Sequence, residues 1–356
     1  MKANALISFF LVLLAFQGPS EGLVPAEPGP PYRVEEITVQ AGDFAVVGDL
    51  YIPAKGSRHP AIVWVHGSGG MTRQNFTPLI KPQIDVILEA GFAFFIDDIP
   101  GSGASKGKIK SVYVDRAMIL TKEIEALKGR PDIVQTRIGV AGMSQAGIVM
   151  PRAATLTSDI AFMIAESCVA ESAYRQQAYL LEQFMICEGR SAEEASGAAA
   201  LERVRYETED YVEYVKAAEY LNNHEIYRLM ELNSPLYTEE RFRTRNKSAD
   251  RPGSYYDPAP MLDRLEFPIL ALFGAKDKNI DPIQGVEAYR RAFQAAGNKL
   301  DRVELIPDAN HVLYEAETGC VRELMAQVAE GRPRCGPGVL RIIAEWLEAL
   351  KAEFEP

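Results

Sequence analysis

The sequence predicts an α/β fold, in which an eight-stranded, mostly parallel and doubly wound sheet carries a helical cap insertion. Three observations predict it: eight short strand-like runs, helical patterns between most of them, and one long strand-free stretch from residue 170 to 255. A strand–helix–strand order produces a parallel sheet with helices on both faces. The 356 residues are enough for one such domain with an insertion.

The expected elements follow one another along the chain. Residues 33–40 and 45–53 alternate polar with apolar side chains, which is typical of half-exposed antiparallel strands. The later runs are continuously apolar, like strands buried on both faces of a parallel sheet; they are residues 61–67, 92–98, 137–142, 160–166, 268–274 and 303–307. Helical spacing predicts helices at residues 81–91, 113–129, 145–156, 285–297 and 339–354.

Residues 1–22 have the pattern of an export signal. Lys2 precedes the apolar stretch 5–16, and small residues follow it. This stretch is shorter than the roughly 20 residues that a membrane span needs, which argues against an anchor. A Pro-rich linker follows at residues 23–32. We therefore expect a secreted or periplasmic protein with no membrane span once the signal is removed.

The folded part divides into a core and an insertion. We expect the core at residues 33–169 and 256–356, with the helical cap insertion at residues 170–255. The insertion either covers the carboxyl edge of the sheet, where ligands bind in such folds, or is a solvated helical excursion with no role there.

Composition narrows the class of partner. The formal net charge is −11, whereas a protein that binds nucleic acid needs a basic face for the phosphates. Residues 101–108 resemble a phosphate-binding loop, but Ile109 stands where a Walker loop needs serine or threonine. No motif has the spacing of a metal site. We expect a small-molecule substrate, no nucleic acid partner, no cofactor and no metal ion.

Four cysteines allow several disulfide arrangements. None belongs to a CxxC pair, which disfavours a zinc site. An oxidising compartment permits disulfides. Cys320 with Cys335 is the favoured pair because it closes a short loop, Cys168 with Cys187 is a second pair, and free buried thiols are the alternative.

Ser144 stands between an apolar strand and an apolar helix, in the stretch Gly142-Met143-Ser144-Gln145-Ala146. This is a G-x-S-x-G pattern with alanine in the last position. The pattern is typical of a sharp strand-to-helix turn with a strained serine at its tip, so the neighbours two positions away must be small. The sequence therefore predicts Ser144 as a nucleophile.

A glycine-rich loop, HGSGG at residues 66–70, comes straight after the strand AIVWV at residues 61–65. Glycine-rich backbone after a strand can turn its N–H groups toward a developing oxyanion. We expect the backbone N–H groups of Ser68 and Gln145 to form the oxyanion hole. The alternative for this loop is a plain glycine turn.

The general base follows by elimination among four histidines. His59 precedes a proline, His66 belongs to the glycine-rich loop, and His224 lies in the acidic insertion. His311 remains, at the carboxyl end of the last predicted strand, where it can reach Ser144.

Asp277, just past the seventh predicted strand, is the expected carboxylate that accepts a hydrogen bond from His311 Nδ1–H. Asp281 and Asp308 are its rivals. Asp281 precedes Pro282 and fits a helix N-cap, and Asp308 lies too close to His311 in the chain.

With the chain order serine, aspartate, histidine, the sequence resembles the α/β-hydrolase superfamily over nearly its whole mature length. The resemblance rests on VWVHGSGG, FAFFIDDIPGSGASKG, GVAGMSQAG, YDPAPMLDRLEFPILALFGAKD and DANH. Within the superfamily it is similar to the dienelactone hydrolase, acyl-CoA thioesterase and serine aminopeptidase-like branches. The resemblance implies a serine hydrolase with a cap after the sixth strand.

The expected reaction is acyl transfer to water, in which Ser144 attacks a carbonyl and His311 takes its proton. The expected substrate is a carboxylic ester. The alternative is an exported serine peptidase or aminopeptidase, in which Glu166, Glu171 or the acidic insertion binds an amino terminus. A binding module without catalytic activity is a further alternative.

Overall fold

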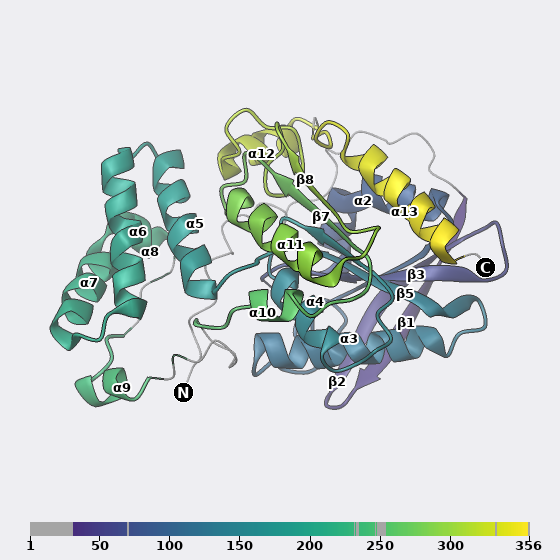
Figure 1. The fold of residues 1–356 in the computed structure, drawn as a ribbon, viewed down its shortest axis with the longest axis horizontal. Helices are drawn as coiled ribbons and strands as arrows, with labels where there is room; N and C mark the ends of the chain where they lie inside the picture. Colours follow the sequence, from purple (N-terminus) through teal and green to yellow (C-terminus); the bar gives the residue numbers. More distant parts are fainter. Residues whose placement is uncertain are drawn as a thin grey trace.

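The computed structural model describes residues 31–354, apart from residues 70, 231, 233, 234, 246, 248–253 and 332. The expected signal segment at residues 1–22 and most of the expected linker at 23–32 lie outside the described residues. Within the described part of the chain, no helix combines the length and the apolar character that a membrane span requires. Figure 1 shows a layered body with a lobe of helices at one side.

An eight-stranded sheet runs through the body in the order β1-β2-β4-β3-β5-β6-β7-β8. β1 (Tyr32–Ala41) and β2 (Phe44–Pro53) pair antiparallel, and β2 is also antiparallel to β4. All other neighbouring strands are parallel. This confirms the predicted sheet. The remaining strands are β3 (His59–Val65), β4 (Ala93–Asp97), β5 (Ile133–Met143), β6 (Met163–Glu166), β7 (Ile269–Gly274) and β8 (Arg302–Ile306).

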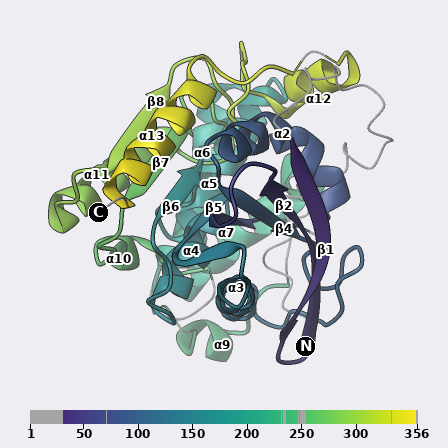
Figure 2. The ribbon, with the colours of Figure 1, turned by 90° about the vertical axis from the view of Figure 1, so that its right-hand side faces the viewer.

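Helices cover both faces of the sheet, and Figure 2 shows α2 and α13 on one side of it and α3 and α4 on the other. Alternate side chains of a strand point to opposite faces of the sheet. A continuously apolar strand therefore has apolar side chains on both faces, and helices pack against each. In β4, Phe95 packs with one core cluster, while Phe94 and Ile96 pack with the other. The covering helices are α2 (Arg73–Glu89), α3 (Val112–Lys128), α4 (Ala146–Ala154), α11 (Pro282–Ala296), α12 (Val321–Ala329) and α13 (Val339–Phe354).

The helical lobe at the left of Figure 1 lies between β6 and β7 in the chain. It has a small core of its own, in which Leu181, Met185, Leu221 and Tyr227 are buried. We call this lobe the cap. Its described helices are α5 (Ala173–Cys187), α6 (Ala192–Glu207), α7 (Tyr211–Asn223), α8 (Glu225–Leu229) and α9 (Glu239–Arg243), and α10 (Ala259–Leu262) leads back to the sheet.

The expected disulfides are wrong. Cys320 is bonded to Cys187, at a Cα–Cα distance of 5.7 Å, whereas Cys168 and Cys335 are free thiols. The segment between Cys320 and Cys335 is not a simple loop, because it contains α12, a helix about 14 Å long. Cys168 is completely buried beside β5, where its Sγ lies 3.3 Å from Gly142 O.

Candidate active site

Ser144 lies at a sharp turn between β5 and α4, in the left-handed region with φ of 58°. A side chain at Gly142 has no room, because its Cβ would lie 2.4 Å from Val65 O and 2.6 Å from Ala146 Cβ. Ala146 therefore fits the last position of the motif because Gly142 has no Cβ opposite it. A Cβ at Gly147 would lie 2.4 Å from Val169 O.

Backbone hydrogen bonds to the residues that end β6 and follow it hold this turn in its strained conformation. Ser144 N–H donates to Glu166 O at 3.1 Å and to Ser167 O at 3.2 Å. Ser144 O in turn accepts from Gly147 N–H at 3.1 Å and from Val169 N–H at 2.9 Å. A left-handed serine persists only where its surroundings fix it in this way, and such strain is concentrated at functional sites.

Asp277 and His311 form a hydrogen-bonded pair. His311 Nδ1 lies 2.8 Å from Asp277 Oδ2, and both residues are buried. The other carboxylate oxygen, Oδ1, accepts from the backbone N–H groups of Asn279 at 2.7 Å and Ile280 at 3.0 Å. The carboxylate is thus fixed on one side by its own loop and can hold the imidazole in one orientation on the other.

The two rival carboxylates have other partners. Asp281 is the N-cap residue of α11, where its Oδ1 accepts from Ile283 N–H at 3.0 Å and from Gln284 N–H at 3.1 Å. Asp308 is mostly exposed and lies 3.3 Å from Lys276 Nζ. Among the three aspartates considered, the structure brings Asp277 to His311.

Ser144, Asp277 and His311 follow β5, β7 and β8 at the same edge of the sheet. Ser144 Oγ is buried and makes no hydrogen bond to any residue that the structure describes. Bonds between nucleophile and base are often long in unliganded enzymes and shorten when substrate binds. Backbone hydrogen bonds connect the strand ends: Ser144 N–H to Ser167 O, Ser167 N–H to Leu272 O, and Ala275 N–H to Ile306 O.

The glycine-rich loop after β3 lies directly against Ser144, since a Cβ at Gly67 would be 3.3 Å from Ser144 Cβ. Ser68 and Gln145 are both buried. Within the described residues, neither of their backbone N–H groups donates a hydrogen bond. Buried N–H groups are rarely left unpaired, so this arrangement suits donors that await a substrate oxyanion.

No motif indicates Arg116, a residue of α3 that contacts both predicted halves of the oxyanion hole. Its Nη1 donates to Gly67 O at 3.0 Å and to Gln145 Oε1 at 2.9 Å, and its Nη2 donates to His66 O. Burial lowers the pKa of Arg116 only to about 10, so the guanidinium stays charged at neutral pH. It thereby joins the glycine-rich loop after β3 to the side chain of Gln145, the residue next to Ser144.

Titratable groups surround Arg116 behind the site. Burial raises the pKa of Asp97 to about 7 and that of Glu123 well above its usual range. Burial lowers the pKa of His66 to about 3, so this imidazole is neutral, and its Nε2 lies 2.7 Å from Asp97 O. A charged pair on the core-facing side of α3, Arg116 and Glu123, was the signal in the sequence that could have revealed the cluster.

Glu166, which ends β6, differs from Glu171 in its surroundings. Burial alone raises the pKa of Glu166 to about 8, and its Oε2 has no hydrogen-bond partner among the described residues. Glu171 is half-buried, and burial, with Asp281 and Asp257 nearby, raises its pKa to about 7. Of the two glutamates proposed to bind an amino terminus, Glu171 alone is partly accessible.

We expect the free energy of unfolding of the wild type to fall between pH 5 and 8 because of Glu166, and we expect the substitution Glu166→Gln to reduce this fall. The folded-state pKa of about 8 exceeds the ordinary 4.5, so in this window the folded protein binds the extra proton. The contribution of Glu166 is therefore complete below pH 4.5 and is lost as the pH rises through 8. Urea unfolding at several pH values should show the free energies of unfolding of variant and wild type diverging by on the order of 4 kcal/mol. Parallel curves would contradict the prediction.

The family model for X-Pro dipeptidyl-peptidase (S15 family) matches residues 44–311. Among curated proteins, none matches the chain. The structure is similar to an esterase from Pyrococcus furiosus, with a TM-score of 0.53 and 15% identity over 91% of this chain and 95% of that one.

Two further solved structures are similar in fold. The acylaminoacyl peptidase from Pyrococcus horikoshii matches with a TM-score of 0.50 and 14% identity, over 90% of this chain and 41% of that one. Est1E from Butyrivibrio proteoclasticus, solved with ferulic acid bound, matches with a TM-score of 0.50 and 15% identity, over 89% of this chain and 98% of that one. At these identities the likeness shows a shared α/β-hydrolase fold.

Proposed function

The chain belongs to the X-Pro dipeptidyl-peptidase (S15) family of hydrolases, and from this premise we propose that Ser144, His311 and Asp277 are its catalytic triad. The observation that carries the proposal is the 2.8 Å hydrogen bond between Asp277 and His311, on loops that follow β7 and β8. The strained Ser144 at the end of β5 supports it, because a nucleophile presented at such a turn is exposed to a bound carbonyl.

The reaction proceeds in two acyl transfers. Ser144 Oγ bonds to the substrate carbonyl carbon while its proton passes to His311 Nε2, and Asp277 stabilises the imidazolium. The backbone N–H groups of Ser68 and Gln145 hold the oxyanion. The imidazolium then gives the proton to the leaving group as its bond to carbon breaks, and water releases the acyl group from Ser144 by the same steps.

We propose carboxylic esters as the substrate class. An ester needs only an acyl pocket beside the nucleophile, whereas an aminopeptidase also needs a charged group for the substrate ammonium. Glu166 is a poor candidate for that charge, because it is buried and protonated at neutral pH. The esterase neighbours share only the fold, so the assignment is a proposal about this chain.

A short peptide with an unblocked amino terminus is the second candidate substrate. The family description favours it, and Glu171 could supply the carboxylate. An ammonium group bound near Glu171 would stabilise its ionised form and lower the raised pKa of that carboxyl.

A substrate panel separates these two classes. We expect kcat/KM for p-nitrophenyl acetate and butyrate to exceed that for Gly-Pro-p-nitroanilide by about tenfold or more, and a fluorophosphonate probe to label the protein once. The reverse order of kcat/KM would select the peptidase. No labelling and no turnover of either class would favour a binding module over an enzyme.

We propose that the protein is exported. The N-terminal pattern of residues 1–22 supports this, and so does the Cys187–Cys320 disulfide, because disulfides persist mainly in oxidising compartments. Detection of the mature chain outside the cytoplasm, starting near residue 23, would test the proposal.

A further inference from the structure

One face of α5 carries a stripe of four residues that all bond to residues outside the cap. They are Gln176, Tyr179, Gln183 and Cys187, at spacings of three, four and four. Residues at these spacings lie on the same side of a helix. Each of the four is partly buried, as expected for the side of the cap that faces the core.

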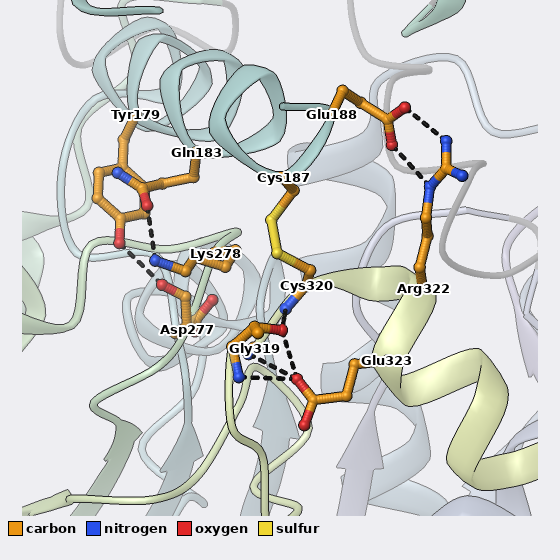
Figure 3. The surroundings of a disulfide bond; sticks show 11 residues. Tyr179, Gln183, Cys187, Glu188, Asp277, Lys278, Gly319, Cys320, Arg322 and Glu323 are labelled. Carbon is orange, nitrogen blue, oxygen red and sulfur yellow. Dashed lines mark hydrogen bonds and ion pairs between the residues drawn. A yellow bond between two sulfur atoms is a disulfide. The ribbon is translucent and has the colours of Figure 1, made fainter. Parts of the chain in front are cut away.

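The first three members of the stripe bond to three consecutive residues of the loop that carries Asp277, and Figure 3 shows the contacts of Tyr179 and Gln183. Tyr179 donates its hydroxyl to Asp277 O at 2.8 Å, and Lys278 Nζ donates to Gln183 Oε1 at 2.9 Å. Gln176 Nε2 donates to Asn279 O at 2.8 Å. The cap therefore contacts the backbone of Asp277, the proposed triad aspartate itself.

The loop is held from its other side by the segment at residues 317–320. Lys276 Nζ donates to Glu317 O at 2.9 Å. The two backbones are in close contact, since a Cβ at Gly319 would lie 1.7 Å from Lys276 O. Gly319 also has a φ of 77°, which favours glycine.

The disulfide joins these two sides. Cys187 ends α5, and Cys320 follows Gly319 directly, so the bond joins the two segments that contact the loop, as Figure 3 shows. Beside it, Glu188 and Arg322 form an ion pair, with Arg322 Nε 2.9 Å from Glu188 Oε1. This pair is exposed at Arg322, so the covalent bond is the stronger part of the closure.

We propose that α5 and the segment at residues 317–320 form a clamp that positions Asp277 for catalysis, with Tyr179 as the positioning residue and Cys187–Cys320 as the lock. The inference rests on the proposed role of Asp277. Because Asp277 Oδ1 is bonded within its own loop and Oδ2 to His311, any shift of the loop backbone moves the carboxylate that orients the imidazole. The cap thus contacts the loop that positions Asp277 and acts through that loop.

The lock is open to reduction. Cys187 and Cys320 are both partly exposed, so a small dithiol can reach the bond. Dithiothreitol converts the disulfide into two thiols and is itself oxidised to its cyclic disulfide. The noncovalent contacts of Tyr179 and Gln176 then hold the loop without the lock, and we expect a reduced kcat.

The first experiment replaces Tyr179 by phenylalanine. We expect kcat for a p-nitrophenyl ester to fall by about tenfold with KM little changed, because the loss affects the orientation of His311 and leaves the substrate pocket intact. The low-field proton resonance of the His311 Nδ1–H···Asp277 bond should shift or broaden. A role in cap stability alone would leave this resonance unchanged.

Tyr211→Phe is the matched control. Tyr211 also donates its hydroxyl to a backbone carbonyl, that of Tyr237 at 3.0 Å, but within the cap. We expect wild-type kcat and an unchanged resonance for this variant. An equal fall in kcat for both variants, or a normal resonance in Tyr179→Phe, would overturn the clamp.

The second experiment tests the lock. Wild-type protein treated with dithiothreitol and the double variant C187S/C320S should both lose kcat by about the same factor, and the double variant should not respond to the reductant. A fully active reduced protein would overturn the role of the disulfide. If the double variant does not fold, reduction of the folded wild type decides the question.

The outcomes separate the clamp from the proposed function. An inactive Asp277→Asn variant together with a fully active Tyr179→Phe variant would sink the clamp and leave the triad intact. A fully active Asp277→Asn variant would remove the triad assignment on which the clamp depends.

Discussion

Replacing Ser144 by alanine is expected to lower kcat for ester hydrolysis by about five to six orders of magnitude. Without the hydroxyl no acyl-enzyme can form, and the remaining oxyanion donors support only slow attack by water. The fold should persist, because Ser144 Oγ makes no hydrogen bond to a described residue and alanine removes one buried atom. Steady-state kinetics and fluorophosphonate labelling measure the effect, and labelling should disappear.

Ser172→Ala is the control for this substitution. Ser172 is likewise buried and its hydroxyl does not cap α5, so the variant should keep wild-type turnover and labelling. Alanine at position 144 has the same left-handed backbone strain as serine, so the substitution does not change that strain. Labelled and active Ser144→Ala protein would mean that another residue is the nucleophile.

Replacing Arg116 by methionine is expected to lower kcat by about 10²–10³, with a smaller change in KM. Arg116 is buried, and the partners that it bonds are protein groups. It holds the carbonyls of His66 and Gly67 and the side chain of Gln145, so its loss frees the two segments that carry the oxyanion donors. A rate loss confined to kcat distinguishes this effect from a damaged substrate pocket.

The same substitution should also cost about 1–3 kcal/mol of unfolding free energy, because it leaves the buried carbonyl oxygens of His66 and Gly67 without their side-chain donor. Arg116→Lys separates the two effects: it keeps the charge but cannot form the fork of three hydrogen bonds, so stability should recover more than kcat. Arg137→Met is the matched control, since Arg137 also donates to a backbone carbonyl, that of Phe354, but lies in the amino-terminal half of β5 and not at the carboxyl end that precedes Ser144. Wild-type kcat in Arg116→Met would contradict the positioning role.

Local patterns in the sequence were sufficient for the fold class. Continuous apolar runs mark strands buried on both faces, and the sheet of eight strands follows from their order. Chain order and elimination selected Ser144, Asp277 and His311 as candidates, and the structure brings Asp277 and His311 into hydrogen-bond contact. The strand patterns and the three candidate residues could be predicted because each depends only on where a residue lies relative to the strand next to it in the chain.

Contacts between segments far apart in the chain were decided by the tertiary structure alone. The sequence favoured a short Cys320–Cys335 loop, but α12 occupies that interval and Cys320 meets Cys187 from 133 residues away. In the sequence Arg116 is only one charged residue of a predicted helix. Its bonds to the glycine-rich loop appear only in the folded structure. The stripe of α5 acquires its role only when the cap folds back on the Asp277 loop, because hydrogen bonds and disulfides require spatial proximity that no local pattern encodes.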